Sequence, residues 1–246
     1  MRNLLAHLRQ LTFSLLPSQC LLCACVLKGD LLCESCHYDL PYAYSKNLCQ
    51  QCGLPINSVG NFCGYCLDHP PAFSRSFIPF TYAYPVDNLI HKFKYYRHLT
   101  CGKLLGRLLA EHLAHCAQED ERWQTPDIII PVPMHWLRRW QRGFNQAEIL
   151  SQYAAHALDI PVETRIIQRT LRTSVQKELT RTERQKNLRK AFSIAENNKL
   201  LVKDKHIALV DDVVTTTATV RELSQLLVKA GARDVQIWAL ARTMER

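Results

Sequence analysis

Glycine and long apolar runs are scarce in this sequence, and each absence excludes a class of protein. The 246 residues include eight glycines, too few for a collagen-like, linker-like or repeat-rich chain. No stretch approaches the ~20 consecutive apolar residues that a transmembrane helix requires. Near the N-terminus His7, Arg9 and Gln10 interrupt the apolar run, which argues against a secretory signal peptide. Leucines recur there at helical spacing, so we expect an amphipathic helix over residues 1–18 of a cytoplasmic protein.

Side-chain constellations for nucleophilic catalysis are also missing. No Ser–His–Asp or Cys–His arrangement is evident, and the ten histidines are scattered along the chain. What the chain has in excess is cysteine, at eleven residues, and positive charge, at a formal net charge of +9. With 47% hydrophobic residues the chain has enough apolar material for a packed core, so it is not a disordered protein.

Nine of the eleven cysteines lie between Cys20 and Cys66. Eight of these nine cysteines form four CxxC pairs. Because two CxxC pairs complete one closed tetrahedral zinc site, the four pairs predict two structural zinc ions. We favour the pairing of neighbouring pairs, which gives a double zinc ribbon over residues 19–70, because short loops cost less entropy to close. An interleaved cross-brace is the alternative, and Cys25 falls outside the spacing. The predicted ligands are Cys20, Cys23, Cys33, Cys36, Cys49, Cys52, Cys63 and Cys66.

The cysteine-rich segment carries little positive charge. Between Cys20 and Cys66 only Lys28 and Lys46 are cationic, against three acidic residues. This is a poor electrostatic footprint for DNA. A closed site of four thiolates has no open position for a substrate, so we expect the zinc ions to fold this segment without catalysing a reaction.

Candidate strands and helices alternate from residue 71 to residue 246. This alternation predicts an α/β domain with an open, mainly parallel sheet. We expect strands over residues 73–85, 127–133, 161–170, 205–212 and 232–242, and helices over 86–98, 101–117, 145–159 and 217–229.

The segment VDDVVTTTAT, residues 210–219, combines groups that suit a sugar phosphate. A strand delivers Asp211 and Asp212 to the carboxyl end of the sheet, where ligands bind in open α/β folds. The following turn leads into a helix, whose N-terminus favours phosphate. The two carboxylates suit the hydroxyls of a ribose. The alternative is that Asp211 caps the helix and the threonines pack in the core.

This segment is similar to the signature for 5-phosphoribosyl 1-pyrophosphate (PRPP) in type I phosphoribosyltransferases: two acidic residues, two apolar residues, then Thr-x-Gly-x-Thr. PVPMHWLRRWQRGFNQAEIL, from residue 131, and QRTLRTSVQKELTRTERQKNLRKAF, from residue 168, resemble two segments of the ComF/GntX family. A double zinc ribbon ahead of a phosphoribosyltransferase domain is the arrangement of that family. The resemblance thus implies a type I phosphoribosyltransferase fold.

The resemblance also implies roles for particular residues. Asp211 and Asp212 would contact the ribose hydroxyls of PRPP, and the loop after Pro133 would lie near the pyrophosphate, with magnesium held largely by PRPP itself. Members of the family are associated with natural competence, DNA uptake and the use of DNA as a nutrient. The expected catalytic residues are Asp211, Asp212, Arg138 and Arg139, and the expected PRPP-binding residues are Asp211, Asp212, Thr215, Thr216, Thr217, Ala218, Thr219, Pro133, Met134 and Arg142.

One position departs from the signature, since Thr217 replaces its glycine. Glycine allows a backbone to approach a phosphate closely and to adopt a positive φ. Either the loop keeps a negative φ and Thr217 adds a hydroxyl donor, or phosphate binding is weakened. This departure puts catalysis in doubt more than it does the fold.

Two arginine-rich segments leave two functions open. Residues 165–190 contain nine Lys and Arg against two Glu, a net charge of +7, and suit either a closing lid or a nucleic-acid site. Arg138, Arg139 and Arg142 are flanked by Trp136 and Trp140, which suits pyrophosphate or single-stranded DNA. The chain is therefore predicted to be a phosphoribosyltransferase, or alternatively a module that senses a phosphoribosyl metabolite or binds single-stranded DNA or DNA-uptake proteins.

Overall fold

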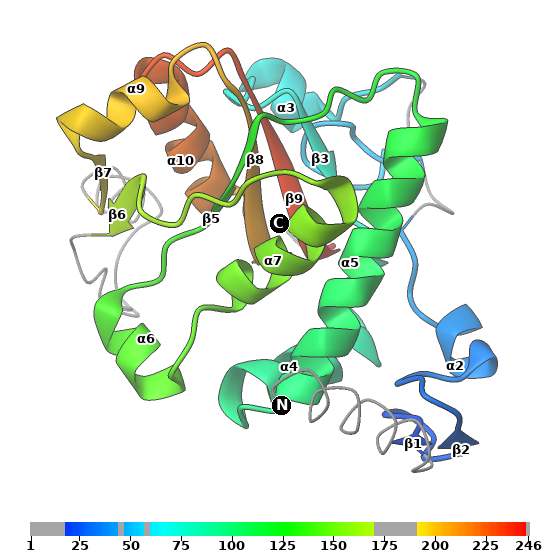
Figure 1. The fold of residues 1–246 in the computed structure, drawn as a ribbon. Helices are drawn as coiled ribbons and strands as arrows, with labels where there is room; N and C mark the ends of the chain where they lie inside the picture. The colour runs from blue at the N-terminus through cyan, green and yellow to red at the C-terminus, as the bar shows by residue number, and fades with distance from the viewer. Residues whose placement is uncertain (1–17, 44–46, 57–59, 170–190, 245–246) are drawn as a thin grey trace, which may run out of the picture.

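The computed structural model describes residues 18–43, 47–56, 60–169 and 191–244 (Figure 1). The helix predicted over residues 1–18 lies outside the described residues except for Ser18, and residues 170–190 of the basic segment over 165–190 also lie outside them. Among the described helices, none has the length and apolar composition needed to cross a membrane.

A parallel sheet forms the centre of the molecule. Its strands lie in the order β3 (Arg75–Phe77), β9 (Asp234–Arg242), β8 (His206–Val214) and β5 (Ile128–Pro131), and β4 (Phe80–Thr81) also pairs with β9. The central strands β8 and β9 read as near-continuous apolar runs because helices cover both faces of the sheet. The predicted α/β fold with a parallel sheet is confirmed.

Two hydrophobic cores lie on the two faces of the sheet. On one face α4 (Val86–Tyr95), α5 (Leu99–Glu119) and α7 (Gln146–Leu158) pack, and α5 and α7 lie on the viewer's side in Figure 1. The other core includes residues of α9 (Lys199–Val202), which follows the short helix η1 (Glu196–Asn198), and of α10 (Ala218–Lys229). The sheet strands run downward in Figure 1, so their carboxyl ends face the edge where α4 and α6 (Trp136–Arg142) lie.

Smaller elements surround this domain. β1 (Ser18–Gln19) and β2 (Val26–Leu27) form an antiparallel pair, followed by α2 (Glu34–Tyr38) and α3 (Gly64–Asp68). Partly buried leucines of the first ribbon, among them Leu21 and Leu31, pack against the core that contains α5. A separate antiparallel pair, β6 (Ile167–Arg169) and β7 (Phe192–Ile194), brackets the basic segment.

The strand expected over 161–170 forms only as β6, in the separate antiparallel pair and not in the main sheet, and β7, η1 and α9 were not expected. Three further differences concern residues 73–85, residues 136–142 and the end of β8. The strand expected over 73–85 is divided into β3 and β4 around Pro79, which has no N–H for a ladder. Residues 136–142, expected as a loop, form α6, which begins where His135 Nδ1 accepts a hydrogen bond from the Leu137 N–H. The strand expected to end at Asp212 continues as β8 to Val214, so both aspartates lie inside the strand near its carboxyl end.

Candidate functional site

The two aspartates of β8 have different partners. Asp212 Oδ1 lies 2.8 Å from Lys94 Nζ of α4, and both side chains are largely buried. Asp211 Oδ1 accepts a hydrogen bond of 2.8 Å from the Asp212 backbone N–H. The sheet and α4 therefore hold two carboxylates and one ammonium group together at the carboxyl edge of the sheet.

Burial, and then the neighbouring charge of Asp212, raises the pKa of Asp211 to about 7. The hydrogen bond from the Asp212 N–H and the charges of Lys94 and Arg169 oppose this rise. Asp211 thus changes its charge close to neutral pH, which is uncommon for a carboxyl group. A carboxyl group with such a pKa is poised to gain full charge when a ligand brings further cations or hydroxyl donors.

Replacing Asp211 by asparagine should stabilise the folded chain at pH 8. Since the pKa is raised in the folded state, ionisation is costlier there than in the unfolded chain, and this cost grows as pH rises from about 4 to about 7 and then levels off. The Tm of the variant should therefore exceed that of the wild type by at least about 4 °C at pH 8 and by less at pH 5. Thermal unfolding of both proteins between pH 5 and pH 8.5 measures this; a Tm difference that shrinks with rising pH contradicts it.

The loop from Thr215 to Thr219 leads into the N-terminus of α10. Its residues Thr215, Thr217, Ala218 and Thr219 line a hollow of about 30 Å³ together with Asp211, whereas Thr216, also expected to bind PRPP, is exposed and does not line it. The first backbone N–H groups of α10 have no partner within the helix, as in any α-helix, and the helix dipole adds positive potential there. This geometry suits a phosphate group placed against Thr215, Thr217, Ala218 and Thr219.

Thr217 has a φ of 61°, in the left-handed region. The alternative in which this loop keeps a negative φ is therefore wrong. The Thr217 side chain is buried, its hydroxyl donates to the Thr216 carbonyl at 2.6 Å, and it accepts from Arg221 Nε at 3.1 Å. The hydroxyl is thus engaged within the protein, and the backbone holds the conformation that the glycine of the signature would adopt without strain.

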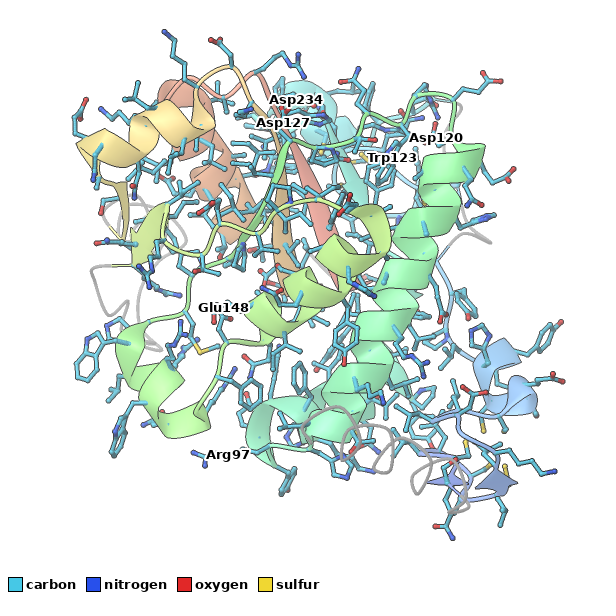
Figure 2. All side chains as sticks on the ribbon, viewed as in Figure 1. Arg97, Asp120, Trp123, Asp127, Glu148 and Asp234 are labelled. Carbon is cyan, nitrogen blue, oxygen red and sulfur yellow. The ribbon has the colours of Figure 1, made fainter. Side chains whose placement is uncertain are left out.

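A basic cavity of about 410 Å³ lies between α4 and α6. It is lined by Lys94, Tyr95, Arg97, Arg138, Gln141 and Arg142. Arg97, which lies between α4 and α6 in Figure 2, donates to the Gln141 carbonyl at 2.9 Å. The Arg142 guanidinium stacks 5.0 Å from the centre of the Tyr95 ring. Four cationic side chains around one cavity suit a multiply charged anion.

The structure does not bring all of the predicted arginines to this cavity. Arg139 Nη1 lies 2.6 Å from Glu148 Oε1, in the first turn of α7 (Glu148 is labelled in Figure 2), and Arg139 does not line the basic cavity. Pro133 and Met134 follow Val132, whose carbonyl accepts from Asn145 Nδ2 at 3.1 Å. This hydrogen bond ties the start of the loop to the start of α7.

Sequence reasoning missed Lys94, Arg97 and Arg169. Lys94 lies on α4 and Arg97 follows the end of that helix, far from every motif in the sequence, and no spacing signals that Lys94 lies beside β8. Arg169 ends β6, its guanidinium lies 5.2 Å from the centre of the Phe192 ring, and it affects the pKa of Asp211. It is one of the nine cationic residues of the basic segment over 165–190, which was the available signal, but the sequence does not single it out from the other eight.

The cysteines form two groups, each with its sulfur atoms within 4.8 Å of one another. The pairing of neighbouring CxxC pairs is confirmed, which excludes the cross-brace. The second group is buried and is made of the predicted ligands, while the first contains Cys25, which the spacing leaves over. The Cys36 N–H donates to Cys33 Sγ at 3.4 Å, so Cys36 lies beside this group. The groups are Cys20, Cys23, Cys25 and Cys33, and Cys49, Cys52, Cys63 and Cys66.

Clustered thiols of this number suit zinc, which binds four thiolates in a closed tetrahedral site. A parallel α/β sheet with an acidic pair and a phosphate-type loop at its carboxyl edge defines the phosphoribosyltransferase class. Family models agree with both parts of the chain: a double zinc ribbon domain matches residues 11–67 and a phosphoribosyl transferase domain matches residues 102–246.

Comparison with individual proteins identifies a narrower family within this class. The chain is 40% identical over 199 residues to the DNA utilization protein YhgH of Escherichia coli K12, which covers 81% of this chain and 86% of that protein. It is 37% identical over 212 residues to competence protein F of Haemophilus influenzae, covering 86% and 90%. A purine phosphoribosyltransferase from Pyrococcus horikoshii aligns with a TM-score of 0.36 at 22% identity, over 56% of this chain and 74% of that one. The chain belongs to the ComF/GntX family of phosphoribosyltransferase-fold proteins.

Proposed function

We propose that this protein binds PRPP with magnesium at the carboxyl edge of its sheet. The observation that carries the proposal is the placement of the Asp211–Asp212 pair directly beside the loop that opens α10. A ribose with a 5-phosphate needs hydroxyl acceptors and a phosphate cradle at this short separation. The basic cavity adjoins the same edge, since Lys94 both lines it and pairs with Asp212.

Each group has a role in this proposal. The Asp211 and Asp212 carboxylates accept hydrogen bonds from the ribose hydroxyls, and the loop over 215–219 holds the 5-phosphate. Arg138 and Arg142 bind the pyrophosphate in the basic cavity. Magnesium bound to that pyrophosphate neutralises part of its charge. We further propose a cytoplasmic location, because a reducing compartment keeps zinc-binding thiols available.

The proposed reaction is transfer of the phosphoribosyl group to a nitrogen nucleophile. The bond between ribose C1 and the pyrophosphate oxygen breaks, the pyrophosphate leaves with the electron pair, and a new C1–N bond forms. The nitrogen then loses its proton to solvent. No covalent intermediate is required, because positioning of the reactants and neutralisation of the leaving group account for the rate enhancement.

Pyrophosphate release separates an enzyme from a sensor. With PRPP, magnesium and a panel of bases and amines, an enzyme releases pyrophosphate in proportion to one added acceptor, and an Arg138→Met variant loses most of this activity. Binding of PRPP without release across the whole panel contradicts the transferase and supports a module that senses a phosphoribosyl metabolite.

A second candidate function is binding of single-stranded DNA. Four aromatic side chains near the basic cavity are exposed to solvent: Tyr95 by 61%, Tyr96 by 71%, Trp136 by 67% and Trp140 by 78%. Exposed aromatic rings beside arginines allow bases to stack while phosphates are neutralised. The names of the two relatives, DNA utilization protein and competence protein, favour a partner of this kind.

Replacing Trp136 and Trp140 together by alanine should weaken single-stranded DNA binding by at least about 10-fold, since each stacked base contributes about 1 to 3 kcal/mol. Fluorescence anisotropy with a labelled oligonucleotide at several salt concentrations measures the affinity. A Tyr38→Ala variant, which removes an exposed ring from α2, is the matched control. Equal affinities for all three proteins, or an affinity that is independent of salt, contradict this second function.

A further inference from the structure

Arg221 connects the second cysteine group to the loop over residues 215–219, which we call the phosphate loop. It lies in the first turn of α10, and its Nε donates to Thr217 Oγ1 at 3.1 Å. From the same guanidinium, Nη2 lies 3.5 Å from Cys66 Sγ and Nη1 donates to the His69 carbonyl at 2.7 Å. The group also stacks 4.9 Å from the centre of the Tyr65 ring. One side chain therefore contacts both a predicted zinc ligand and the residue that replaces the signature glycine.

Arg242 makes a parallel connection from the end of β9. Its Nε donates to the Cys52 carbonyl at 2.8 Å. Its Nη1 donates to the Val214 carbonyl at 3.0 Å and also to the Thr215 carbonyl. The side chain is almost fully buried, so these contacts are held in one geometry. The second cysteine group is thus linked to both ends of the turn from Val214 to Thr217.

The second ribbon is itself fixed to the edge of the sheet. The Ser76 N–H donates to the Gln50 carbonyl at 2.9 Å, and the Ser76 hydroxyl donates to the Gln51 carbonyl at 2.5 Å. Gly53 has a φ of +69°, and a Cβ at this position would lie 3.2 Å from Ile78 Cδ1. The CxxC turn therefore packs closely on β3 and its following residue.

The phosphate loop needs such support at Thr217. A β-branched residue is disfavoured at a positive φ, and such a conformation persists only where the surroundings determine it. Arg221 supplies one of these determinants by its hydrogen bond to Thr217 Oγ1. Arg242 supplies another by holding the carbonyls that precede the turn.

We propose that the second zinc ribbon positions the phosphate loop, with Arg221 and Arg242 as the positioning residues that connect them. The effect on ligand affinity rests on the proposed binding of PRPP. Loss of zinc from the group of Cys49, Cys52, Cys63 and Cys66 frees the arginines from their ribbon contacts, loosens the turn at Thr217 and weakens binding. The coupling is reciprocal, so a bound ligand also stabilises the ribbon.

The test uses Arg221→Met, which keeps the side-chain length but removes the donors, in the full-length zinc-loaded protein. Arg107→Met is the matched control, because Arg107 lies on α5 and its Nη1 is 3.9 Å from Asp30 of the first ribbon. Both variants should keep the zinc content of the wild type. Titration calorimetry with PRPP and magnesium should show about 10-fold weaker binding for Arg221→Met and less than 2-fold for Arg107→Met.

A Thr217→Gly background separates positioning from a general loss of stability. Glycine adopts the φ of the loop without support, so Arg221→Met should cost less than about 3-fold in affinity there. Hydrogen exchange of the backbone over residues 213–219 gives a readout that needs no ligand. Exchange should rise in Arg221→Met and in wild-type protein after chelation of zinc, but not in Arg107→Met.

Unchanged exchange over 213–219 after zinc removal, or an equal loss of affinity in the threonine and glycine backgrounds, overturns the inference. A wild-type protein that does not bind PRPP with magnesium contradicts the proposed function instead. In that case the exchange data still decide whether the ribbon positions the loop.

Discussion

Replacing Asp212 by asparagine should weaken binding of PRPP with magnesium by more than about 100-fold. Asp212 accepts a charged hydrogen bond from Lys94 and faces the same edge as Asp211, so its charge anchors one side of the proposed ribose site. Hydrogen bonds to a charged group contribute about 1.5 to 3 kcal/mol each, and two such bonds to the ribose diol account for the expected loss. Titration calorimetry at pH 8, where Asp211 is ionised, measures the two dissociation constants.

The control is Asp204→Asn, which removes one negative charge from an exposed position before β8. Its affinity should stay within about 2-fold of the wild type. The direction of the pH dependence provides a second check. Because the pKa of Asp211 is about 7, affinity in the wild type should rise between pH 6 and pH 8 as the carboxylate forms. Equal affinities for Asp212→Asn and the wild type would place the ribose elsewhere.

A chain with Cys63 and Cys66 both replaced by serine should lose one of two zinc ions and unfold its second ribbon. The apolar core of this ribbon is small: it consists of the four cysteines with Leu54, against which Ile56 and Tyr65 pack. Segments of this size fold only when a metal or another cross-link supplements the core. Elemental analysis should fall from about two zinc ions per chain to about one, and thermal unfolding should begin at least about 10 °C lower.

Cys116→Ser is the matched control, since Cys116 lies on α5 outside both cysteine groups. It should retain about two zinc ions and an unchanged onset of unfolding. A wild-type protein with about one zinc ion, or a Cys63→Ser/Cys66→Ser variant with unaltered zinc content, would contradict the scheme of two closed sites.

The sheet and the ribbons were predictable because their signals are local. The apolar run of β8 ends in two aspartates, and the regular CxxC spacing identifies the ligands of the second ribbon. In the first ribbon the spacing does not decide between Cys25 and Cys36, because backbone turns bring the Cys25 thiol into the same group and place Cys36 beside Cys33. The helix α6 was missed, because its cap is a histidine, His135, and not one of the residues preferred at that position.

The site itself was predictable only in part, because tertiary contacts complete it. Lys94 contacts Asp212 although the two residues are 118 positions apart in the sequence. Nothing in the sequence pattern of α4 distinguishes this lysine from its neighbours. Arg139 and Arg142 lie on one short helix, but Arg139 forms an ion pair with Glu148 outside the basic cavity, whereas Arg142 lines the cavity. Thr217 has a positive φ and accepts a hydrogen bond from Arg221, and this contact is made in the folded chain and is not signalled by the loop sequence.

Titration calorimetry of the wild-type protein with PRPP and magnesium, at two temperatures and pH 8, tests the central claim most directly. We expect saturable binding of one PRPP per chain and clearly weaker binding of ribose 5-phosphate, which lacks the pyrophosphate that the basic cavity would hold. The absence of heat at both temperatures, or equal affinity for ribose 5-phosphate, would contradict it.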